Sequence, residues 1–143
     1  MRGKWRTFRA LSGAERRAFA EALVELAAAR VLVRFVPLAR WRDRFGDLGG
    51  DTPPEPSRRD DVRLVRQAMD RATRNAPVGF ACLPRALAAR RMLRRRGIEP
   101  SLQIGIARDP HAAERLHAWL KLGDDFVTGD CDESTFRPLE PVR

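Results

Sequence analysis

One cysteine and one histidine in this sequence have the surroundings that nucleophilic catalysis requires. Cys82 follows the helix-breaking residues Pro77 and Gly79 and stands at the predicted start of a helix. Peptide dipoles at a helix N-terminus favour the reactive thiolate, so this position predicts a lowered thiol pKa. His117 lies in an alternating segment, on the face opposite the leucines. The pair predicts a cysteine nucleophile with a histidine as its base.

A site of this kind also needs a group that orients the imidazole, and several acids follow His117 in the sequence. Asp124 and Asp125 fall in a predicted hairpin turn, where aspartate is common for conformational reasons alone. Asp130 lies past the returning strand, about level with His117 if the hairpin pairs tightly. We therefore expect Asp130 to orient the imidazole, with Asp132 and Asp125 as alternatives.

The second cysteine has different neighbours. Cys131 stands among Asp130, Asp132 and Glu133, and negative charges raise a thiol pKa, which predicts a poor nucleophile. Two thiols in a cytosolic chain make a poor disulfide framework. The cysteines and histidines also lack the paired short spacing of zinc ligands. We therefore expect no metal and no cofactor.

Each of these side chains also has an ordinary structural interpretation. A small buried residue is among the commonest fates of cysteine, and His117 beside Trp119 fits a structural histidine. His111 lies in a polar loop and is expected to be solvated. An oxyanion hole would use the Cys82 N–H and a second donor, for which Gln103 and the Trp119 indole are candidates.

Composition excludes some classes of protein. The 143 residues suit one domain, and no apolar run is long enough to span a membrane. The basic N-terminus runs into charged residues and not into an apolar signal core, so we expect a cytosolic protein. The net charge of +9 permits nucleic-acid binding, but the arginines are dispersed and tyrosine is absent. Nucleic acid is therefore not the expected partner.

The first part of the chain is predicted to be helical. Ser12 to Glu15 reads as a capping box that opens a helix ending before Pro37. The apolar stripe of this helix is interrupted by Arg30, and its members are Phe19, Ala22, Leu23, Leu26 and Val33. Further helices are predicted at residues 41–45, 59–74 and 82–96, with a Pro- and Gly-rich loop between the first two and Gly97 ending the last.

The period then changes to that of strands. Alternation predicts strands at residues 101–107, 116–122, 126–128 and, at a sheet edge, 136–139. The order predicts an α+β fold in which the helix that begins at Cys82 packs on an antiparallel sheet. We expect one domain over residues 1–143, with a helical part at 1–45, a loop at 46–58 and a catalytic core at 59–143.

Several motifs resemble a known family. They are Ala81-Cys82-Leu83-Pro84-Arg85-Ala86-Leu87-Ala88, the segment 93–98, Leu102-Gln103-Ile104-Gly105-Ile106 and His117-Ala118-Trp119-Leu120. Trp5, the segment 11–17 and the ending at 136–139 also fit. Over nearly its whole length the chain resembles the transglutaminase-like lasso peptide maturation proteins, which are leader peptidases.

The resemblance implies a function, a fold and partners. It implies a transglutaminase- or papain-like core with Cys82 and His117 as the catalytic pair, and an Asp on the strand or loop after the histidine. It further implies removal of the leader from a ribosomally made precursor peptide, after which a separate lasso cyclase closes the ring. The chain resembles the split form, whose partner is a separate leader-binding protein.

Two other functions remain open from the residues. A non-catalytic basic module would bind nucleic acid or an acidic protein through its arginines. A thiol acyltransferase or transglutaminase would use the same Cys82, because one triad supports both hydrolysis and acyl transfer.

Overall fold

The computed structural model describes residues 10–37, 40, 56–79 and 81–139. The helix predicted near Trp41, the motif residue Trp5 and the loop predicted at 46–58, apart from its last three residues, lie outside this part of the chain. The elements follow in the order α2 (Gly13–Phe35), η2 (Pro56–Arg58), α4 (Arg59–Asn75), α5 (Cys82–Arg95), β1 (Ser101–Ala107), β2 (Leu116–Leu122), β3 (Asp125–Thr128), η3 (Glu133–Thr135) and β4 (Phe136–Pro138). The predicted α+β class is confirmed.

The helix boundaries follow from their local chemistry. In α2 the Ser12 side chain accepts from the Glu15 N–H, and the Glu15 carboxylate accepts from the Ser12 N–H, which is the predicted capping box. The helix ends at Phe35, two residues before Pro37. At the other end of the helical region α5 ends at Arg95, and Gly97 follows with a φ of 72°, a conformation that glycine adopts without strain.

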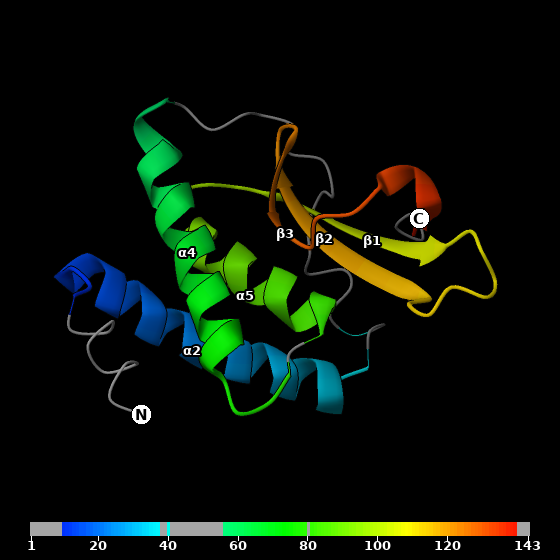
Figure 1. Cartoon of the computed structure of the whole chain (residues 1–143), viewed down its shortest axis with the longest axis horizontal. Helices are drawn as coiled ribbons and strands as arrows, with labels where there is room; N and C mark the ends of the chain where they lie inside the picture. Colours follow the sequence, from blue (N-terminus) through cyan, green and yellow to red (C-terminus); the bar gives the residue numbers. More distant parts are fainter. Residues whose placement is uncertain (1–9, 38–39, 41–55, 80, 140–143) are drawn as a thin grey trace.

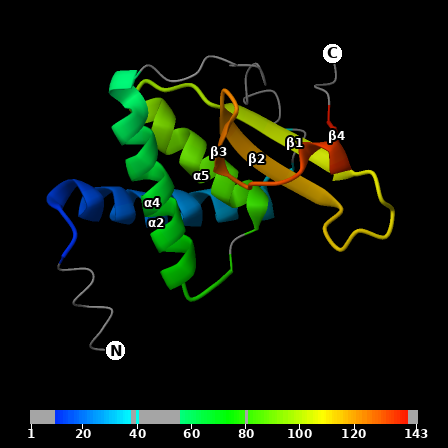
Figure 2. The same cartoon turned by 45° about the horizontal axis from the view of Figure 1, so that its top comes forward.

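The four strands form one antiparallel sheet in the order β3-β2-β1-β4 (Figure 2). β1 and β2 pair along their length, with Gly105 opposite His117. β4 lies at the outer edge of β1, as the proline in its sequence predicted. β3 pairs only with residues 120–122 of β2 and includes a register shift at Leu120, so the first half of β2 extends beyond it.

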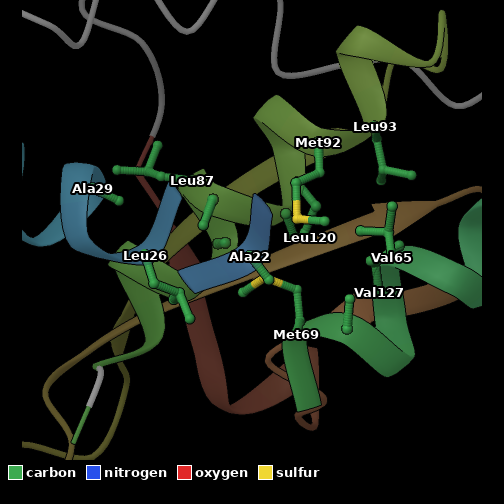
Figure 3. Close-up of a cluster of buried hydrophobic side chains, with 14 of the residues drawn as sticks. Ala22, Leu26, Ala29, Val65, Met69, Leu87, Met92, Leu93, Leu120 and Val127 are labelled. Atoms are coloured by element: carbon green, nitrogen blue, oxygen red, sulfur yellow. The ribbon is translucent and has the colours of Figure 1, made fainter. Parts of the chain in front are cut away.

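Helix α5 contacts both the other helices and the sheet. Figure 1 shows α5 between α2 and the strands, with α4 crossing beside it. The core draws side chains from all of these elements: Leu26 from α2, Met69 from α4, Met92 from α5 and Leu120 from β2 are completely buried (Figure 3). Truncating one such side chain to alanine costs about 2–5 kcal/mol of stability.

The predicted apolar stripe of α2 packs on the core, and the buried face also includes one charged residue that the stripe did not contain. Glu25 is 3% exposed, and its carboxylate oxygens lie 2.5 Å from Arg95 and 3.4 Å from Arg91 of α5. Glu21 pairs with Arg96 at 2.7 Å in the same way. These arginines therefore join two helices.

None of the described helices combines the length and apolar character needed to cross a bilayer.

Candidate active site

Cys82 occupies the first position of α5, as predicted, with Ala81 as an extended N-cap. Pro84 lies in the first turn, where its missing N–H costs no intrahelical hydrogen bond. The sulfur faces the part of β2 that β3 leaves unpaired. Its Sγ lies 3.9 Å from the Leu116 carbonyl oxygen, and backbone hydrogen bonds from Ala118 and Leu83 favour its thiolate form.

The predicted lowering of the Cys82 pKa is wrong. Burial of the thiol raises the pKa, because removal from water disfavours the charged thiolate. The backbone hydrogen bonds from Ala118 and Leu83 act in the lowering direction, whereas the negative charge of Glu114 raises the pKa further. The resting cysteine is therefore a neutral thiol that needs a base to lose its proton.

His117 lies on the sheet face opposite the helices and is 8% exposed. Its Nε2 lies 2.9 Å from the Gly129 carbonyl oxygen. Because a carbonyl can only accept, we assign the proton of the neutral ring to Nε2, which leaves a lone pair on Nδ1. The structure thus gives His117 the tautomer of a base.

A carboxylate absent from the predicted site lies next to this base. Glu114 Oε2 is 3.1 Å from His117 Nδ1, within ion-pair distance but not aligned for a hydrogen bond. Sγ of Cys82, an oxygen of Glu114 and a ring nitrogen of His117 all lie within 4.8 Å of one another. The predicted thiol and imidazole are therefore close together, with an acid beside them.

Aromatic rings fix the position of the imidazole. The His117 ring stacks on Phe136 at a centroid distance of 5.2 Å and on Trp119 at 5.9 Å. Gly105 makes room for this packing, since a Cβ there would meet both Phe136 and Trp119 at 2.9 Å. The rings restrict the rotation of His117 and so hold Nδ1 toward Cys82 and Glu114.

The acids predicted to orient His117 are not its hydrogen-bond or ion-pair partners in the described part of the chain. The described residues show no hydrogen bond or ion pair between His117 and the exposed Asp130. Asp132 caps the short helix η3 through Ser134, and Asp125 pairs in β3 opposite Leu122. In this structure the Gly129 carbonyl is the group that holds Nε2.

The two side chains considered as oxyanion donors have other partners. The Trp119 indole N–H donates to Glu133 at 2.8 Å, and the Gln103 amide donates to Ser101 Oγ at 2.9 Å. The N–H groups of Cys82 and Leu83 precede the first intrahelical hydrogen bond of α5, which the Arg85 N–H donates to the Ala81 carbonyl. These backbone groups are the better candidates.

Comparison with known proteins identifies the superfamily. The sequence profile of the transglutaminase-like superfamily matches residues 7–140. The chain belongs to this superfamily. No curated protein and no solved structure matches it. As a transglutaminase-like domain with a helix-borne cysteine beside a strand-borne histidine, the chain fits cysteine-protease or transglutaminase-type chemistry.

Sequence reasoning missed Glu114 in this transglutaminase-like site. It lies in the segment between β1 and β2, and its side chain is 57% exposed. The available signal was its spacing from His117, because residues three apart near a strand start can approach each other when the chain bends between them. That signal is weak without knowledge of where β2 begins.

Proposed function

We propose that this transglutaminase-like protein is a cysteine peptidase that removes the leader from a ribosomally synthesised lasso peptide precursor. The observation that carries the peptidase assignment is the clustering of the Cys82 sulfur and a His117 ring nitrogen within 4.8 Å. The choice of a lasso precursor rests on the motifs around Cys82 and His117 and on their order in the sequence.

The mechanism starts from a neutral pair. As Cys82 Sγ attacks the peptide carbonyl, its proton passes to the Nδ1 lone pair of His117. The Nε2–H bond to the Gly129 carbonyl keeps the ring in the tautomer that can accept this proton. The imidazolium then returns the proton to the leaving amine of the core peptide, and water hydrolyses the thioester.

Glu114 acts on both charges that this transfer creates. Its carboxylate disfavours the Cys82 thiolate but stabilises the imidazolium 3.1 Å away. The two effects oppose each other in a thiolate–imidazolium pair. Once the sulfur has bonded to the substrate and lost its negative charge, only the stabilisation of the imidazolium remains.

The proposal includes partners. A separate leader-binding protein would present the precursor, and a lasso cyclase would use the released core peptide. The pairing of Arg91, Arg95 and Arg96 with acids of α2 supports a structural use of part of the basic charge over nucleic-acid binding.

The test is cleavage of a precursor peptide in the presence of its leader-binding protein, followed by mass spectrometry. Wild type should release leader and core with one water added across the cut bond, and Cys82→Ala should release neither. Cys131→Ala is the matched control, because it removes the other thiol. Cleavage by Cys82→Ala would refute the nucleophile, and an isopeptide or new amide product would identify an acyltransferase.

A further inference from the structure

The buried Nδ1 atom of His117 has no hydrogen-bond partner in the described part of the chain. Unsatisfied buried nitrogens are uncommon in folded proteins, because leaving one without a partner costs free energy. Glu114 Oε2 lies 3.1 Å from it, and the Cys82 sulfur belongs to the same cluster. A lone pair, a carboxylate and a thiol therefore converge on one point.

This set of donors matches the ligands of a zinc ion. Zn²⁺ binds thiolate sulfur at about 2.3 Å and imidazole nitrogen or carboxylate oxygen at about 2.0 Å, which places tetrahedral ligands about 3.3–3.5 Å apart. The observed Nδ1–Oε2 separation is 3.1 Å, and all three donor atoms lie within 4.8 Å of one another. Tetrahedral spacing requires the side chains of Cys82 and the exposed Glu114 to turn toward the imidazole.

The surroundings of the imidazole also fit a metal ligand. A zinc-bound histidine almost always donates its second ring N–H to a carbonyl or carboxylate, which fixes its tautomer and orientation. His117 has this arrangement already, with Nε2 on the Gly129 carbonyl and Nδ1 3.1 Å from Glu114 Oε2. Three protein ligands leave a fourth position for water, because Glu114 lies at the exposed side of the cluster.

We infer that Cys82, Glu114 and His117 form a three-ligand site for Zn²⁺, and that zinc reversibly blocks the nucleophile. Binding replaces the thiol proton, which is released to solvent, and uses the Nδ1 lone pair that would otherwise accept it. A zinc-loaded chain therefore has neither a free thiolate nor a free base. Metal binding itself depends only on the geometry, whereas the blocking effect rests on the peptidase function proposed above.

Co²⁺ titration of the metal-free full-length protein tests the site without an activity assay. We expect one equivalent of Co²⁺ to produce a thiolate-to-cobalt charge-transfer band and tetrahedral d–d bands, all of which Zn²⁺ removes. Cys82→Ala should abolish the charge-transfer band, and Glu114→Gln should weaken cobalt binding at least tenfold. Circular dichroism confirms that each variant is folded.

Cys131→Ala is the matched control, because Cys131 also has acids around it. If the cobalt band disappears in Cys131→Ala and persists in Cys82→Ala, the proposed site is wrong. Unchanged cobalt affinity in Glu114→Gln, or no stoichiometric binding at micromolar Co²⁺, equally overturns it.

The two proposals fail in different ways. Cleavage of the precursor by the chelator-treated protein, unaffected by one equivalent of Zn²⁺, would overturn zinc inhibition and leave the peptidase intact. A cobalt band that depends on Cys82, in a protein that never cleaves precursor, would overturn the peptidase and support the metal site.

Discussion

The regions around Cys82 and Cys131 surround two thiols with different partners. Burial raises the pKa of both, and acidic side chains raise it further in each case. Cys82, however, has backbone hydrogen bonds from two residues and an imidazole in its cluster. Cys131 has the charges of Glu133, Asp130 and Asp132, which act as the sequence predicted, and among the described residues only Lys121 opposes them.

The difference shows that a low thiol pKa is not what distinguishes the candidate nucleophile. Both thiols are neutral at rest, so reactivity depends on a base that can remove the proton during attack. His117 supplies one at Cys82, and among the described residues no histidine lies in the acidic cluster around Cys131. Four experiments test this comparison, in order of decreasing expected effect.

Removing each thiol in turn gives the largest contrast. We expect Cys82→Ala to lower precursor cleavage by at least about 1,000-fold, because the covalent step is lost. Cys131→Ala should stay within about twofold of wild type. Single-turnover kinetics with the leader-binding protein present measures both, and comparable losses in the two variants would remove the distinction between the thiols.

The carbonyl that holds His117 can be displaced through Gly129. This residue has a φ of 77°, and a Cβ would approach the Ala118 carbonyl oxygen to 2.5 Å, so alanine must move the backbone. We expect Gly129→Ala to reduce kcat/KM about 100-fold through misorientation of the imidazole. Gly13→Ala, whose Cβ meets nothing within 4 Å, is the control. Full activity in a folded Gly129→Ala protein would show that the carbonyl contact is dispensable.

Glu114 affects the proton equilibrium of Cys82 but should not affect that of Cys131. Its negative charge disfavours the thiolate, so Glu114→Gln should lower the Cys82 pKa and accelerate alkylation at any pH below it. The pH dependence of iodoacetamide labelling, measured in a Cys131→Ala background, reports this shift. Asp124→Asn in the exposed turn is the matched charge control. A shift toward higher pH in Glu114→Gln would contradict the assigned interaction.

Substitution of Asp130 distinguishes the two groups that could orient His117. The sequence predicted Asp130, whereas the structure has the Gly129 carbonyl at Nε2. If the Gly129 carbonyl orients His117, Asp130→Asn should leave cleavage within about twofold of wild type. The same change should lower the pKa of Cys131, since Asp130 is one of the charges that raise it. Cleavage rates and Cys131 labelling profiles measure the two effects. A 100-fold loss of cleavage would show that Asp130 does orient His117.

Local patterns predicted most of the fold. The Ser12–Glu15 capping box, the break before Cys82 and the alternation in β1 and β2 each depend on residues close in sequence, and each is present. The buried Glu25 was not predicted, because its burial depends on arginines of α5 that pair with it. Long-range charge pairing has no periodic signature in either helix.

The site was predicted in part. Cys82 and His117 come together as the alternating period and the helix start suggested, but tight hairpin pairing would have placed Asp130 opposite His117. The register shift at Leu120 moves the returning strand by one residue, so that Thr128 lies opposite Leu120. A bulge depends on packing around the whole hairpin, which the sequence of the turn does not reveal.

The brevity of β3 has a consequence for how the hairpin can be altered. The Leu116 carbonyl and the Ala118 backbone meet the cysteine sulfur because the partner strand stops before reaching them. If β3 paired with two more residues of β2, its backbone would occupy the position of the Cys82 sulfur. The nucleophile would then be inaccessible to substrate. Insertions that lengthen the β2–β3 hairpin are therefore limited by the need to keep Cys82 accessible, even where the chain would still fold.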